Sequence, residues 1–229
     1  MSRAFRLVPA LLLPCFAIDT TTIGAALEYP AVVSSTTSSV TAALTLAEYD
    51  YVGPGVTQRT RVYNGEMAGP TIRIKPGDTV TVTLTNNLPP ETHDTSNVHN
   101  QFRDFDRTNL HTHGLHVSSA SPGDDIFIDV GPGASFTYTY TIPPEHMGGT
   151  FWYHAHHHGS TNIQAGGGAV GVIIVEDAVG ALPAPVANAE EMIMMLHHFN
   201  SAPRTHRVIL ATRSHPAHTS LARCSQCRS

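Results

Sequence analysis

Two pairs of histidines, each pair separated by one residue, are the feature of this sequence best suited to chemistry. His111 and His113 stand in NLHTHGLH, residues 109–116, and His154 and His156 stand in GTFWYHAHHHG, residues 149–159. In a β-strand, residues two apart share a face and lie roughly 7 Å apart. Two such pairs on neighbouring strands would bring four imidazoles into one small volume. Imidazole binds copper, zinc, iron and nickel, so the pattern predicts a metal site.

The residues around these pairs narrow the choice of metal. No Asp or Glu lies within either motif, which disfavours an iron site with two histidines and one carboxylate. No Cys lies nearby, which disfavours structural zinc. HTHGLH resembles the dinuclear zinc motif HxHxDH of metallo-β-lactamase-like hydrolases, but Leu115 stands where that family has Asp. The sequence also lacks the alternation of strands and helices that such a fold needs.

The remaining histidines carry weaker signals. A lone histidine is usually a surface residue or a hydrogen-bonded polar residue, so five are assigned no metal role: His93, His99, His146, His197 and His198. Two roles stay open for His116, His157 and His158, which could orient the metal ligands or face the solvent.

Short segments in which apolar and polar residues alternate indicate an all-β domain. DTVTVTLTNNL (78–88) is the clearest, since Val80, Val82 and Leu84 would face one side of the strand and the threonines the other. The other predicted strands, separated by Gly, Pro, Asn and Asp, are 44–52, 56–65, 71–75, 125–130, 135–142, 149–156 and 168–177. Strands at this spacing favour an antiparallel sandwich or barrel. The polar segment 89–108 is predicted to be a long connection.

The composition of the segments before and after this β domain differs from that of the domain itself. Residues 1–26 place two arginines before a short apolar run, which is typical of a secretory signal peptide, so we expect a secreted, extracellular or periplasmic protein. Residues 27–43 are predicted to be a linker, and residues 44–178 the β domain. Residues 179–200 are interpreted as a linker and the start of an incomplete second domain. The arginine-rich residues 201–229 are interpreted as an aberrant, disordered tail in which Cys224 and Cys227 are incidental.

The charge of the chain argues against nucleic-acid binding, and its hydropathy argues against a membrane-spanning segment. The chain has 13 basic and 18 acidic residues and a formal net charge of −5, so it offers no basic stripe for nucleic acid. After the N-terminal segment, no apolar run approaches the roughly 18 residues of a membrane-spanning helix. We therefore expect neither nucleic-acid binding nor a membrane span.

Five segments together resemble the first plastocyanin-like domain of the multicopper oxidases, a family of laccase-like and cuprous-oxidase-like enzymes. They are NGEMAGPTIRIKPGDTVTVTLTNNL, NLHTHGLHVS, PGASFTYTYTIP, GTFWYHAHHHGST and GGAVGVIIVED, in the family's order, and the resemblance covers residues 45–200. It implies a cupredoxin-like Greek-key β-sandwich and copper as the cofactor. It also implies that His111 binds the type 2 copper, and that His113, His154 and His156 bind the type 3 pair, of a trinuclear cluster. In the family, that cluster reduces dioxygen to water while a phenol, an aromatic amine or a metal ion is oxidised.

Two motifs of this family are missing from the sequence. The family's C-terminal domain supplies the other four cluster histidines and the type 1 copper ligands in HxxHxH and HCHxxxH, and neither motif occurs here. Three hypotheses follow. The chain is the N-terminal part of a multicopper oxidase whose C-terminal cupredoxin domain is missing, or a stand-alone copper-binding module without turnover, or a subunit whose cluster is completed by another chain. In none of them is this chain alone a catalytically complete oxidoreductase.

Overall fold

The computed structural model describes residues 30–53, 56–92, 102–201 and 205–214, which consist mainly of β-strands and loops. The strands are β1 (Val32–Ser34), β2 (Ser39–Gly53), β3 (Val56–Tyr63), β4 (Thr71–Ile74), β5 (Thr79–Asn86), β6 (His111–His113), β7 (Ser135–Thr141), β8 (Gly149–His154), β9 (Val170–Val175), β10 (Met192–Ser201) and β11 (Thr205–Ser214). Helices α1 (Thr161–Ala165) and α2 (Ala184–Ala187) are short. Within the described ranges, no helix is long and apolar enough to cross a membrane.

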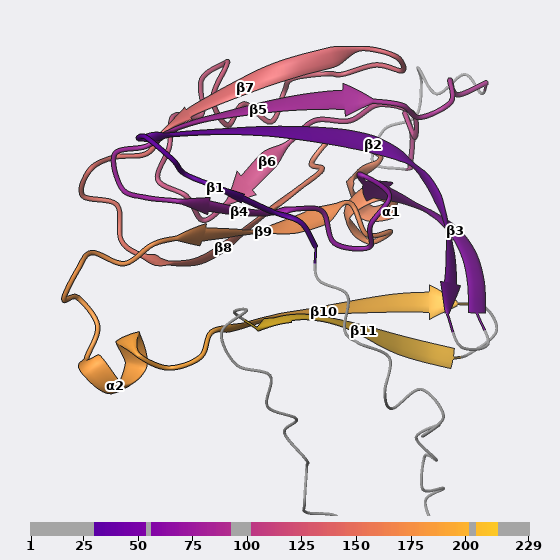
Figure 1. Ribbon diagram of the computed structural model, residues 1–229. Coiled ribbons are helices and arrows are strands. Elements are labelled where there is room, and N and C mark those ends of the chain that lie inside the picture. Colours follow the sequence, from indigo (N-terminus) through magenta and orange to yellow (C-terminus); the bar gives the residue numbers. More distant parts are fainter. Residues whose placement is uncertain (1–29, 54–55, 93–101, 202–204, 215–229) are drawn as a thin grey trace, which may run out of the picture.

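Two mixed sheets form the body of the molecule. One has the strand order β3-β2-β5-β7 and the other the order β1-β4-β9-β8-β6. Figure 1 shows β2, β5 and β7 as one layer above the layer that contains β4, β8 and β9. The predicted all-β sandwich is confirmed, but its strands are not all antiparallel. Strand β2 pairs in parallel with β5, and β4 pairs in parallel with both β1 and β9.

The alternation in β5 places its apolar residues in the core, as predicted. Val80, Val82 and Leu84 are at most 4% exposed. The threonines on the other face pair across the sheet surface, where the hydroxyls of Thr83 and Thr137 lie 3.2 Å apart. Since both sheets bury one face in this way, the core lies between them.

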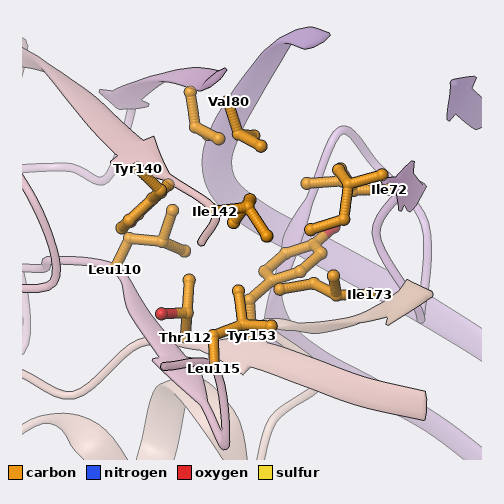
Figure 2. Close-up of a pocket in the computed structure, with 11 residues that line it drawn as sticks. Ile72, Val80, Leu110, Thr112, Leu115, Tyr140, Ile142, Tyr153 and Ile173 are labelled. Carbon is orange, nitrogen blue, oxygen red and sulfur yellow. The ribbon is translucent and has the colours of Figure 1, made fainter. Parts of the chain in front are cut away.

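A small apolar cavity of about 10 Å³ in this core shows which way the residues of β6 and β8 point. Thr112 of β6 and Tyr153 of β8 line it, and Figure 2 shows both side chains directed into the core among Ile72, Leu110 and Ile142. Thr112 is 3% exposed and Tyr153 is fully buried. Because neighbouring residues of a strand point to opposite faces, the histidines beside Thr112 and Tyr153 point out of the sandwich.

Strands β10 and β11 form an antiparallel hairpin outside the sandwich. In Figure 1 it lies on the far side of the second sheet from the first. Among the described side chains, polar contacts at Glu191, just before β10, and at His197 link it to the sandwich. Arg73 of β4 donates two hydrogen bonds to Glu191, at 2.6 and 2.9 Å, and His197 Nε2 lies 2.9 Å from the carbonyl oxygen of Gly166.

Two predicted boundaries are wrong. The expected linker 27–43 contains, in its described part, strand β1 and the first residues of β2, because its Ser- and Thr-rich sequence pairs in parallel with β4 and β5. The expected disordered tail 201–229 contains strand β11, whose backbone pairs with β10 over its whole length. Strand β10 covers the last residues of the segment 179–200, which is interpreted as a linker and the start of a second domain.

The predicted strand at 125–130 is also wrong. This segment forms only an isolated bridge between Val130 and Thr108. Its backbone bonds instead to side chains, since Asp125 accepts from the amide of Phe127 at 2.9 Å and Asn109 donates to the carbonyl of Ile126 at 2.6 Å. The predicted signal peptide, His93, His99, Cys224 and Cys227 lie outside the described residues, as does the side chain of His198.

Candidate metal centre

Strands β6 and β8 bring the two histidine pairs together. They pair antiparallel, with His111 opposite His154 and His113 opposite Trp152. Strand β6 is the last strand of its sheet, so the histidines lie at a sheet edge. The prediction that the two motifs occupy neighbouring strands is confirmed for His111, His113 and His154. His156 lies two residues beyond the end of β8 and is not in a strand.

All four imidazoles nevertheless cluster. One ring nitrogen from each of His111, His113 and His154 lies within 4.8 Å of the others. The ring of His156 joins them, with its centroid 5.0 Å from that of His111 and 5.7 Å from that of His154. The four histidines that the sequence pattern indicates therefore lie close together in the fold.

The hydrogen bond of His154 to the backbone decides which of its ring nitrogens can bind a metal. Its Nδ1 lies 3.0 Å from the carbonyl oxygen of Ala155, to which it donates, so Nε2 carries the lone pair and presents it towards His113. Nε2 of His154 is 3.4 Å from Nδ1 of His113. Two nitrogens that bind one ion tetrahedrally at about 2.0–2.1 Å lie about 3.3 Å apart. The spacing of these two nitrogens therefore fits shared ligation of one ion.

Trp152 holds two of these rings in place. Its indole stacks on His154 with ring centroids 4.2 Å apart and on His113 with centroids 4.8 Å apart. It is the only tryptophan in the chain and is 38% exposed. The indole thus restricts both imidazole rings and places a fluorophore directly beside the cluster.

Asp124 is a site residue that sequence reasoning missed. Its Oδ2 lies 2.9 Å from Nδ1 of His111, and its Oδ1 accepts a 2.8 Å hydrogen bond from the amide of Thr112. The approach to His111 lacks the alignment of a hydrogen bond, so the carboxylate acts on that ring through its charge. Asp124 lies 12 residues after Thr112, outside the first motif, and only the loop that returns to β6 reveals the contact.

The protonation of the cluster suits metal binding. Burial lowers the pKa of His154 to about 4; its bond to Ala155 opposes the shift, while the neighbouring histidines add to it. Burial also lowers the pKa of His156. Both rings are therefore neutral at pH 7, as ligand imidazoles must be.

Two buried nitrogens of the cluster lack a hydrogen-bond partner. Among the described residues, Nδ1 of His111 and Nδ1 of His156 are such atoms, although Nδ1 of His111 faces the Asp124 carboxylate at 2.9 Å. Buried polar atoms are rarely left unpaired in folded proteins, and ligation by an ion is one reason for an exception. Convergent imidazoles, two of which have a lowered pKa, fit a copper ion, for which imidazole is a suitable ligand.

The other histidines lie around this cluster and not within it. His146 is buried, and its Nε2 accepts a 3.1 Å bond from the amide of His116 while its Nδ1 donates to Met147. His157 turns towards Asp129, at 3.6 Å, and burial lowers its pKa. His116 and His158 are exposed. His197, like His146, lies within hydrogen-bond distance of a backbone carbonyl, that of Gly166.

A β-sandwich with histidines clustered at one sheet edge, on the edge strand β6 and at the end of its neighbour β8, defines a metal-binding domain of the cupredoxin-like class. Comparison with known proteins specifies the family. The family model described as multicopper oxidase matches residues 47–96 and 94–179, which is more than half of the chain. The chain belongs to the multicopper oxidase family, and copper is the metal that this membership implies.

Individual relatives agree with this assignment. The putative multicopper oxidase GMC1 of Saccharomyces cerevisiae is 39% identical over 112 residues, which cover 47% of this chain and 17% of the yeast protein. A laccase of Cryphonectria parasitica is 33% identical over 147 residues, which cover 61% of this chain and 21% of the laccase. The crystal structure of a multi-copper oxidase from Pediococcus acidilactici superposes with a TM-score of 0.52 and 25% identity, covering 66% of this chain and 29% of that one. The chain thus spans about a fifth of the length of these two curated relatives.

Proposed function

We propose that this chain is the copper-binding N-terminal cupredoxin domain of a secreted multicopper oxidase and supplies half of the ligands of its trinuclear cluster. His111 is the ligand to the type 2 copper, and His113, His154 and His156 are the ligands to the type 3 pair. The observation that carries the proposal is the convergence of three ring nitrogens within 4.8 Å at the edge of the sandwich. The 3.4 Å spacing of His113 Nδ1 and His154 Nε2 supports a shared type 3 ion.

In this proposal the copper centre, once complete, reduces dioxygen to water with electrons from a phenol, an aromatic amine or a metal ion. The residues of this chain bind and orient. Trp152 and the carbonyl of Ala155 fix the His154 ring, and Asp124 places negative charge beside His111. This charge favours a bound cation over an empty site.

The other four ligands and the type 1 copper come from a further cupredoxin domain, on the same polypeptide or on a second chain. The edge position of β6 supports this part of the proposal, because no strand of the described residues lies beyond the histidines on that side. A stand-alone copper-binding module is the second candidate. It is favoured by the fact that three imidazoles of this chain already converge without another domain.

Titration with Cu(II) is expected to quench the fluorescence of Trp152 strongly and saturably. The open-shell ion would lie against imidazoles that stack on the indole at 4.2 and 4.8 Å, and such an ion quenches an adjacent excited ring. Since Trp152 is the chain's only tryptophan, the signal reports on this site alone. The measurement is emission intensity against added copper.

Zn(II) serves as the control, since this closed-shell ion can occupy the same imidazoles without comparable quenching. Tight copper binding by equilibrium dialysis with unchanged Trp152 emission would mean that copper binds elsewhere, and the proposed ligands would be wrong.

A further inference from the structure

His156 is the one ligand that no strand holds. The β6–β8 ladder fixes His111 and His154 opposite each other, and β8 ends at His154. Beyond that point the backbone of residues 155–160 turns towards helix α1. A side chain two residues past the end of a ladder needs another restraint if it is to stay among the ligands.

The side chain of Asn109 provides that restraint. Continuing the register of β6 and β8 by two residues places Asn109 opposite His156. At this position the Oδ1 of Asn109 accepts a 2.8 Å hydrogen bond from the backbone amide of His156. The amide side chain therefore continues the pairing where the backbone ladder stops.

The same side chain also reaches the loop that carries Asp124. The Nδ2 of Asn109 donates a 2.6 Å hydrogen bond to the carbonyl of Ile126. Asp124 in this loop contacts His111 and the amide of Thr112. Asn109 is fully buried, so these bonds do not compete with solvent. One side chain thus joins the start of β6, the segment of His156 and the loop of Asp124.

We infer that Asn109 is a positioning residue for the copper centre, which holds His156 in place through its backbone amide. The inference rests on the proposed function, because it assumes that His156 binds copper. Asn109 touches neither the metal nor a substrate in this account, and its effect passes through the position of the His156 ring.

A double-mutant cycle with His156 tests the inference. In the full chain, Asn109→Ala is expected to weaken Cu(II) binding about 10-fold or more, as loss of a partner that orients a ligand does. In a His156→Ala background, the same change is expected to alter affinity by less than about 2-fold, because the ligand that Asn109 positions is gone. Affinity is measured with Cu(II) ions alone, by titration of Trp152 emission.

Asn86 offers a matched control. It is also fully buried, and it also bonds the loop backbone, donating to the carbonyls of Asp106 and Val130 and accepting from the amide of Leu88. Asn86→Ala should lower the urea midpoint of unfolding about as much as Asn109→Ala does, since both changes leave buried backbone groups unpaired. It should leave copper affinity within about 2-fold of the wild type.

The outcomes separate the inference from the proposed function. If His156→Ala weakens copper binding while Asn109→Ala does not, or if the two effects simply add, the inference is overturned and the proposed function stands. If His156→Ala leaves affinity unchanged, the ligand assignment fails, and the inference fails with it. Equal losses of affinity in the Asn86 and Asn109 variants would also overturn the inference, since they would indicate general loosening.

A measurement without any variant covers the case in which Asn109→Ala does not fold. In the wild-type chain, hydrogen exchange of the His156 amide should be slowed about as much as that of amides within β8, because Oδ1 of Asn109 occupies it. The amide of the exposed residue His158 should exchange faster. Rapid exchange of the His156 amide would contradict the restraint.

Discussion

Replacing His111 and His113 together by alanine is expected to abolish copper binding at the cluster. The change removes two of the three side chains whose nitrogens converge within 4.8 Å, and leaves His154 without the nitrogen that lies 3.4 Å from its own. The loss should exceed the roughly 10–100-fold typical of residues that only support a ligand. Copper content after dialysis, together with Trp152 emission, measures it.

A second double variant, His116→Gln with His158→Gln, is the control for this experiment. Both side chains are exposed and lie outside the converging set, so the number of histidines falls equally while the cluster stays intact. This variant should bind copper as the wild type does. Unchanged copper content in the alanine variant, with a native circular dichroism spectrum, would show that the wrong histidines had been chosen.

The copper-loaded chain is expected to lack both the intense blue absorption of a type 1 site and turnover of a phenolic substrate. A blue copper site needs a cysteine with two histidines, and the described part of the chain contains no cysteine. Without that copper, electrons from a phenol have no entry to the histidine cluster. The measurements are the visible spectrum and oxygen consumption with a phenol, each against the same concentration of free copper.

An intense blue band would show that the chain builds a type 1 site by itself. Sustained oxygen consumption above the free-copper control would show that the chain is catalytically complete, and the need for a further cupredoxin domain would be refuted.

The sandwich itself was predictable because strands such as β5 alternate between buried and more exposed residues. In β5, Val80, Val82 and Leu84 face the core as the sequence indicates, and the pairing of β6 with β8 follows from the two histidine motifs. The parallel pairs were not predictable in this way. Alternation specifies which face of a strand is buried, but not which strand lies beside it.

Residues 125–130 show where alternation misleads. DIFIDV has a strand pattern, yet Phe127 is 78% exposed and the segment bonds to the side chains of Asn109 and Asp125. In this segment, hydrogen bonds from short polar side chains to the backbone take the place of hydrogen bonds between strands. The local pattern of residues 125–130 does not reveal a partner such as Asn109, which bonds to Ile126 from seventeen residues away.

The candidate site also contains both residues that the local sequence pattern predicted and residues that it did not. The four clustered histidines were predicted as ligands because two pairs of histidines, each at a spacing of two, carry a strong local signal. Asn109 and Asp124 were not, since each acts through a contact made only after the chain folds. The predicted reason for the position of His156 was also incomplete: the ring joins the cluster although strand β8 has already ended.

The most direct test of the account is the position of copper in a crystal of the copper-soaked protein, located by anomalous scattering at the copper absorption edge. The account predicts a strong peak between His113 Nδ1 and His154 Nε2, about 2.0–2.1 Å from each, with further copper towards His111 or His156. The account would be contradicted if copper bound only away from these four side chains. It would also be contradicted if the four side chains were well ordered in the crystal but showed no anomalous copper peak.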